Sequence, residues 1–132
     1  MAGETKIAWC DATANFWLGC HKVSTGCKNC YAETLTTNRM GLHVWGPPST
    51  TSRQPVKGVW ANVRKWNRDA AAAGQRRNVF VGSLMDWAED HPALPHIRTE
   101  MWLAIGAAPC LNFLMLTKRS ERIRELLPAD WG

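Results

Sequence analysis

The stretch NVFVGSL, from residue 78 to residue 84, decides how the fold is interpreted, because it is short, apolar and partly β-branched. A run of this kind predicts a buried strand of a parallel sheet. A second such run, LNFLMLT, covers residues 111 to 117. Between the two, the stretch HIRTEMWLAIGAAP at residues 96–109 has a helical pattern that ends at Pro109.

Helical patterns also flank the two predicted strands. In VWANVRKWNRDAAAAG, at residues 59–74, apolar side chains at spacings of four, three and four predict an amphipathic helix that ends at Gly74. These apolar positions are Val59, Val63, Trp66 and Ala70. The stretch KRSERIRELL, at residues 118–127, predicts a further helix with Ser120 as its N-cap. The alternation of strands and helices indicates an α/β fold of parallel βα units.

One domain is expected over residues 1–132, since a chain of this length can bury a single core. Residues 1–44 are interpreted as a cysteine-rich segment with a strand near residues 6–9 and a helix from residue 31. Residues 45–58 are rich in Pro, Gly and Ser and predict a loop, and residues 59–132 hold the βα units.

The composition indicates the cellular compartment of the protein and the kinds of partner that it could bind. The chain has neither a signal-peptide pattern nor an apolar run long enough to span a membrane, so a cytoplasmic protein is expected. Its five cysteines, an odd number, are then interpreted as thiols or metal ligands. A net charge of +5 permits contact with nucleic acid, but the basic residues are spread along the chain, as on an ordinary solvated surface.

The most specific motif is GCHKVSTGCKNCYAE, in which Cys20, Cys27 and Cys30 are separated by six and then two residues. Three thiolates in one loop suit an iron–sulfur cluster or zinc. A four-iron cluster on three thiolates leaves one iron open to another ligand, which implies chemistry. The alternative is a structural zinc site, in which Cys10 or His21 would be the fourth ligand.

The segment KIAWCDATANFWLGCHKVSTGCKNCYAE resembles the opening of a phage-encoded three-cysteine family, uncharacterised and similar to radical S-adenosylmethionine enzymes. The resemblance continues through NVFVGSLMDWAED and FLMLTKRSERI. It implies a 4Fe-4S cluster on Cys20, Cys27 and Cys30, S-adenosylmethionine as the second cofactor, and an unknown substrate. It also implies the amino-terminal half of an incomplete (β/α) barrel. Because the family runs on past residue 132, a second chain or self-association is expected to complete the barrel before catalysis.

Polar residues that follow the two strands are the candidates for binding S-adenosylmethionine. They are Ser83, Asp86, Thr117 and Lys118. Because chemistry in such folds gathers at the carboxyl ends of the strands, these side chains are expected near the cofactor pocket, although each could instead cap a helix. Asp11 and Asn15 are expected to orient the cysteine loop through bonds to backbone N–H groups, and Cys110 is expected in the core.

Overall fold

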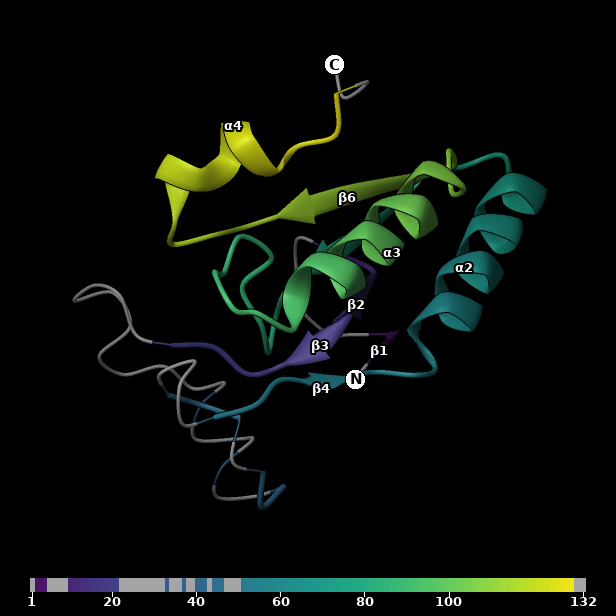
Figure 1. The fold of residues 1–132 in the computed structure, drawn as a ribbon. Helices are drawn as coiled ribbons and strands as arrows, with labels where there is room; N and C mark the ends of the chain where they lie inside the picture. Colours follow the sequence, from purple (N-terminus) through teal and green to yellow (C-terminus); the bar gives the residue numbers. More distant parts are fainter. Residues whose placement is uncertain are drawn as a thin grey trace.

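A computed structural model describes residues 10–21, 33, 37, 40–42, 44–46 and 51–129, together with the backbone of residues 2–4. Its centre is a four-stranded sheet in the order β1-β2-β5-β6 (Figure 1). The strands are β1 (Ala2–Glu4), β2 (Ala12–Ala14), β5 (Arg77–Val81) and β6 (Leu111–Met115). Strands β2, β5 and β6 are mutually parallel, while β1 pairs with β2 in the antiparallel direction.

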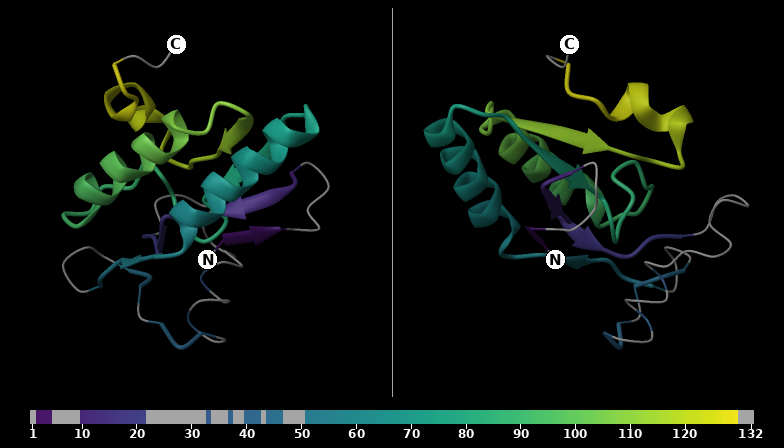
Figure 2. Two further views of the ribbon diagram at one scale, coloured as in Figure 1. Left: turned by 90° about the vertical axis from the view of Figure 1, so that its right-hand side faces the viewer. Right: turned by 180° about the vertical axis from the view of Figure 1, so that it is seen from behind.

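Two helices, α2 (Val59–Ala73) and α3 (Leu94–Gly106), lie on the same side of this sheet, as the turned views in Figure 2 show. Helix α2 leads into β5, and α3 connects β5 to the parallel strand β6. The buried residues of α2 are Val59, Val63, Trp66 and Ala70, which confirms the predicted apolar stripe. Gly74 adopts φ 64° and ends the helix, as predicted.

The core lies between the helices and one face of the sheet. Side chains that alternate along a strand point to opposite faces, and residues paired in parallel register share a face. Ala14 pairs with Val81, which pairs with Met115, so this row faces the helices, where Leu94 and Met101 of α3 are also fully buried. The opposite face carries Thr13, Phe80 and Leu114, all of them only half-buried.

A small second sheet and a short helical segment complete the described part. Strands β3 (Trp17–Leu18) and β4 (Gln54–Pro55) form a two-stranded antiparallel sheet. After β6 the chain forms a short 3-10 helix, η3 (Ser120–Arg122), and a single turn of helix, α4 (Ile123–Leu126). Among the described residues, no helix has the length and apolar character needed to cross a membrane.

The structure confirms the α/β class and the parallel βα units, with three parallel strands. The predicted strands over residues 78–84 and 111–117 appear as β5 and β6 with shifted or shortened ends, and the predicted helix over residues 96–109 appears as α3. The strand expected near residues 6–9 and most of the helix expected from residue 31 lie outside the described residues.

Two local predictions need correction, and one strand was missed. Strand β2 was not predicted, because its Ala-Thr-Ala sequence carries little pattern and its burial comes from pairing with β5. The segment 45–58 is not loop throughout, since it contributes β4 to the small sheet. Ser120 is not an N-cap: it is the first residue of η3, and no side chain caps that helix.

Candidate cofactor site at the carboxyl edge of the sheet

Cys20 lies beyond the carboxyl end of β5. The preceding residue, Gly19, forms a parallel bridge with Met85, and its N–H donates to the Leu84 carbonyl at 3.0 Å. The Cys20 carbonyl accepts from Gly46 at 3.0 Å. Gly19 has φ 112°, and a Cβ there would lie 2.2 Å from the Val44 carbonyl oxygen, so only glycine allows this close approach.

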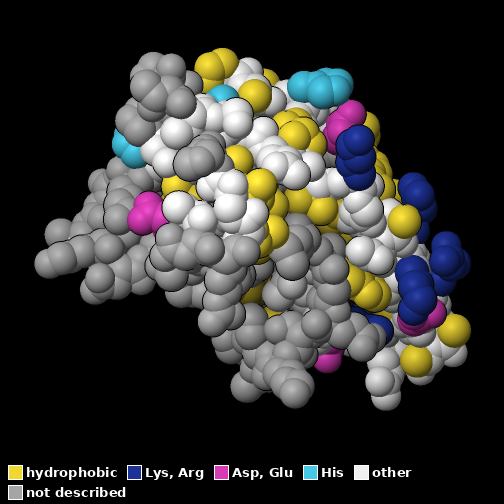
Figure 3. Space-filling model, turned by 90° about the horizontal axis from the view of Figure 1, so that it is seen from below, with side chains coloured by type: hydrophobic (Ala, Val, Ile, Leu, Met, Phe, Trp, Pro, Cys, Tyr) yellow, Lys and Arg dark blue, Asp and Glu magenta, His cyan; other side chains and the backbone are white. Residues whose placement is uncertain are grey.

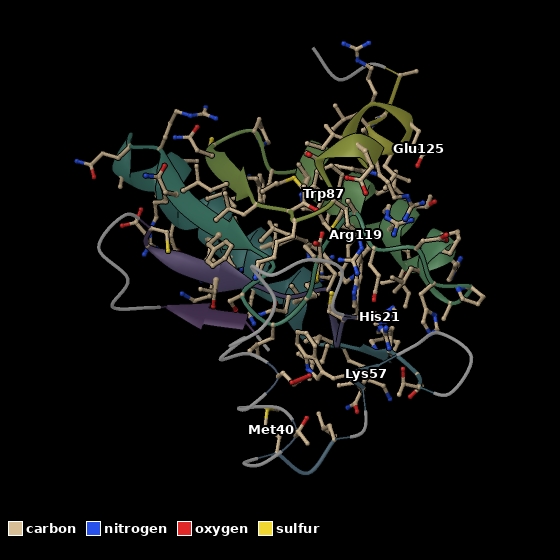
Figure 4. The ribbon with its side chains drawn as sticks, turned by 90° about the vertical axis from the view of Figure 1, so that its left-hand side faces the viewer. His21, Met40, Lys57, Trp87, Arg119 and Glu125 are labelled. Atoms are coloured by element: carbon tan, nitrogen blue, oxygen red, sulfur yellow. The ribbon has the colours of Figure 1, made fainter. Side chains whose placement is uncertain are left out.

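The sulfur of Cys20 lies against a guanidinium. The cysteine is 6% exposed, and Nη1 of Arg119 donates to its Sγ at 3.3 Å. Nη2 of the same arginine donates to the His21 carbonyl at 2.6 Å (Figure 4). Burial, followed by the nearby Glu89 carboxylate, raises the pKa of the Cys20 thiol to about 12, although Arg119 acts in the opposite direction. Without a metal, the thiol therefore stays protonated at neutral pH.

Asp86 organises the loops that follow β5 and β6. Its Oδ1 accepts from the Ala88 N–H at 3.0 Å and from the Thr117 hydroxyl at 2.5 Å. Its Oδ2 accepts from the Lys118 N–H at 3.0 Å and from Arg119 Nη1 at 2.9 Å. These four bonds use both oxygens of the buried carboxylate, so Asp86 acts by positioning its neighbours.

The predicted cofactor-binding residues therefore fall into two groups. Asp86, Thr117 and Lys118 are joined by hydrogen bonds, and Arg119 links them to Cys20. Ser83 belongs to a second group, in which its hydroxyl accepts from the Asn15 side-chain amide at 2.8 Å. The other metal-binding candidates, Cys27 and Cys30, lie outside the described residues.

Asn15 and Asp11 bond to backbone N–H groups, but at opposite ends of β5. The Asn15 side-chain oxygen accepts from the Leu84 N–H at 2.7 Å, beyond the carboxyl end of that strand. The Asp11 carboxylate accepts from the Asn78 N–H at 2.8 Å, near its amino end. Of the two, Asn15 alone braces the edge of the sheet at which Cys20 lies.

A buried ion pair, Arg53–Glu89, supports the site and was not predicted from the sequence. Two hydrogen bonds of 2.7 Å join the two side chains, which are 0% and 1% exposed. Arg53 also donates to the carbonyls of Val44 and Gly46 at 2.9 and 3.0 Å, and so ties the segment beside Cys20 to Glu89. Because 36 residues separate the partners, no local motif signals the pair.

The chain was compared with known proteins. Residues 4–132 match the family model described as a protein of unknown function (DUF5131). The chain belongs to the DUF5131 family. No curated protein and no solved structure matches it. Because the family description names no activity, the function of this DUF5131 chain has to be inferred from its residues.

At this edge, the described residues of the DUF5131 chain offer one candidate metal ligand, Cys20. Among them, no group of three or more His, Cys, Asp or Glu side chains could hold a metal ion, so Cys20 would need partners from the rest of the chain. A guanidinium donor suits an anionic sulfur. Trp45, whose backbone is bridged to Cys20, has a buried indole N–H with no hydrogen-bond partner in the described part.

Cys10 of the DUF5131 chain lies away from this group. It precedes β2, and the N–H of the next residue, Asp11, donates to the Asn78 carbonyl at 2.8 Å, near the amino end of β5. Cys20 lies beyond the carboxyl end of the same strand. The length of β5 therefore separates the two cysteines, whereas His21 is directly adjacent to Cys20. Cys110 is half-buried and packs against the core.

Proposed function

We propose that the chain binds an iron–sulfur cluster through Cys20, Cys27 and Cys30, and that it binds S-adenosylmethionine for a reaction on an unidentified substrate. The observation that carries this proposal is the contact of 3.3 Å between Arg119 and the buried Cys20 sulfur, beyond the carboxyl ends of the parallel strands. Ligand and cofactor sites in parallel α/β folds gather at this edge.

The spacing of the cysteines gives independent support. Cys27 and Cys30 are separated by two residues, and Cys20 precedes them in the same segment. Three soft thiolates suit iron–sulfur binding. When bound, such a cluster would supply an open iron and an electron for cleavage of S-adenosylmethionine.

The residues at the carboxyl edge of the sheet would bind and orient S-adenosylmethionine. Asp86 fixes the Thr117 hydroxyl and the Lys118 N–H, and Lys118 has an exposed side chain that brings positive charge to this edge. Ser83, held by Asn15, adds a hydroxyl after β5. We propose that Thr117, Lys118 and Ser83 bind the polar groups of S-adenosylmethionine, and that Asp86 holds the loop in shape.

The test is metal analysis of protein purified and reconstituted without oxygen. We expect about four irons and four acid-labile sulfides per chain. Replacing Cys20, Cys27 or Cys30 singly by Ser should sharply lower both contents, whereas Cys110→Ser, the control, should retain them. Loaded wild-type protein is then reduced with S-adenosylmethionine, and cleavage is followed by chromatography.

The main competing outcome is zinc. One tightly bound zinc per chain, with no iron or sulfide after reconstitution, would overturn the proposal. If His21→Ala also released that zinc, the site would be a structural one completed by the residue next to Cys20. The position of Cys10 at the other end of β5 gives no support to a zinc site that recruits it.

A further inference from the structure

The Arg119 guanidinium is held at both terminal nitrogens. Nη1 donates to Cys20 Sγ at 3.3 Å and to Asp86 Oδ2 at 2.9 Å. Nη2 donates to the His21 carbonyl at 2.6 Å and lies 3.9 Å from Glu89 Oε2. Each terminal nitrogen carries two hydrogens, so this planar group can meet all of these neighbours at once. Arg119 is itself only 5% exposed, and its position is therefore fixed.

A fixed donor of this kind has a defined effect on a sulfur that binds a metal cluster. Hydrogen bonds to cluster sulfurs, and positive charge beside them, stabilise the added electron and so raise the reduction potential. Burial strengthens the effect, because electrostatic interactions are weakly screened away from water. Of the described side chains, Arg119 is the one that donates a hydrogen bond to Cys20 Sγ.

The surroundings of Arg119 distinguish this role from substrate binding. Asp86 and Glu89 provide two carboxylates for its charge, and the His21 carbonyl occupies a further N–H. A guanidinium with these partners has little capacity left for an incoming ligand. Its contact with Cys20 is therefore present before any substrate binds, and we assign Arg119 no role in substrate binding.

We propose that Arg119 is a positioning residue that sets the reduction potential of the iron–sulfur cluster through its hydrogen bond to Cys20. This inference rests on the proposed function, since it requires Cys20 to be a cluster ligand. Asp86 would hold the guanidinium in place through its bond of 2.9 Å. Glutamine in place of Arg119 would remove the charge, and lysine would keep the charge but lose the planar pair of donors.

The experiment is a redox titration of the reconstituted protein, followed by absorption and electron paramagnetic resonance. Arg119→Gln should lower the midpoint potential enough to change the ratio of oxidised to reduced cluster by at least about tenfold at fixed potential. For one electron, that change corresponds to about 59 mV. Arg119→Lys should give a smaller shift in the same direction.

Arg122→Gln is the matched control. Arg122 is three residues further along and donates to the Ala88 carbonyl at 2.8 Å and to Glu125 at 2.9 Å. The variant removes the same charge without removing a bond to sulfur, so its potential should stay close to that of the wild type.

The outcomes separate this inference from the proposed function. If wild-type protein holds no cluster, the proposed function fails. If wild-type and variant clusters form with equal potentials, the inference alone fails. Loss of the cluster from both Arg119 variants, with their thermal unfolding intact, would also overturn it, because Arg119 would then determine binding rather than potential.

Discussion

At the scale of single residues, Glu89 links several of the buried side chains that surround Cys20. Its carboxylate receives two hydrogen bonds of 2.7 Å from Arg53 and lies 3.9 Å from Arg119. Its backbone carbonyl accepts from Arg98, whose guanidinium also lies 5.8 Å from the centre of the Trp17 ring. Removing one partner from such a buried network leaves an uncompensated charge.

We therefore expect Arg53→Met to lower the free energy of unfolding by about 3–5 kcal/mol, as for other broken buried ion pairs. The variant would also release the Val44 and Gly46 carbonyls from Arg53. Urea denaturation followed by circular dichroism would measure the loss.

Lys65→Met is the control for this substitution. Lys65 pairs with Asp69 at 2.9 Å, but both side chains are exposed, so the loss should be at most about 1 kcal/mol. Equal losses in the two variants would mean that the Arg53–Glu89 pair does not stabilise the fold.

The Cys20 thiol gives metal-free protein a specific pH dependence. Its pKa rises from the ordinary 9.0 to about 12 on folding, mainly through burial. At a pH between these two pKa values, the folded chain keeps a proton on Cys20 that the unfolded chain has released. The resulting stabilisation is complete below pH 9.0 and is lost as the pH rises toward 12.

We expect the free energy of unfolding of metal-free protein to fall more steeply between pH 9 and pH 11 than that of Cys20→Ser, which lacks this titration. Urea denaturation of both proteins at several pH values would measure the difference. Parallel curves would show that the Cys20 thiol titrates alike in the folded and unfolded chains.

At the scale of secondary-structure elements, the close approach of the backbone to Val44 just after β3 determines where Cys20 lies. Gly19→Ala would place a methyl group 2.2 Å from the Val44 carbonyl oxygen, at a φ of 112°. Combining backbone strain with overpacking, we expect a loss of about 2–5 kcal/mol in unfolding free energy. Iron content after reconstitution should fall as well, because the next residue is Cys20.

Gly74→Ala is the matched control for the Gly19 substitution. Gly74 also has a positive φ, of 64°, but a Cβ there would meet nothing within 4 Å. Its loss should be about 1–2 kcal/mol, from backbone strain alone. Thermal unfolding would compare the two variants, and similar losses would indicate that the segment at Val44 moves aside readily.

Some of the secondary-structure elements could be predicted from the sequence and others could not. The stripe of α2 and the apolar runs of β5 and β6 were predicted because each pattern lies within one continuous stretch. Strand β2 was not, since its three residues gain their burial from a partner more than sixty residues away.

For the site, the rule that chemistry gathers after parallel strands led to Asp86, Thr117 and Lys118, which the structure brings together. The links from Arg119 to Cys20 and from Arg53 to Glu89 are tertiary contacts, 99 and 36 residues apart in the chain. Arg119 could be noted as a residue that follows β6, but nothing in its local sequence indicates a bond to sulfur.

At the scale of the whole molecule, the described sheet is covered by helices on one side. The other face carries the half-buried Phe80 and Leu114, and β6 is an edge strand of the described sheet. Leu116, next to the end of β6, is 58% exposed. Edge strands with apolar neighbours favour pairing with another chain.

We expect concentration-dependent self-association in sedimentation velocity, weakened by Leu116→Glu. Leu103→Glu is the control, because Leu103 is as exposed but lies on helix α3 and not on a strand or its extension. Sedimentation as a monomer at all concentrations would contradict the expected second chain.

Several exposed basic side chains lie on α2 and just before it. They are Lys57, Arg64, Lys65 and Arg68. Further exposed basic residues lie elsewhere in the described part, namely Arg76, Lys118 and Arg124. In Figure 3, basic side chains are spaced along the margin on the side of α2, with acidic side chains among them. Binding to nucleic acid stays a prediction, and its signature would be affinity that falls steeply with salt.

The separation of 99 residues between Arg119 and Cys20 also has a consequence for biosynthesis. The ribosome makes the chain from its amino terminus, so all three cysteines of the motif are synthesised long before the arginine. A cluster inserted into the nascent chain would therefore sit beside an unfinished site and be exposed to oxidation. We expect cluster delivery to follow the synthesis and folding of the segment that carries Arg119.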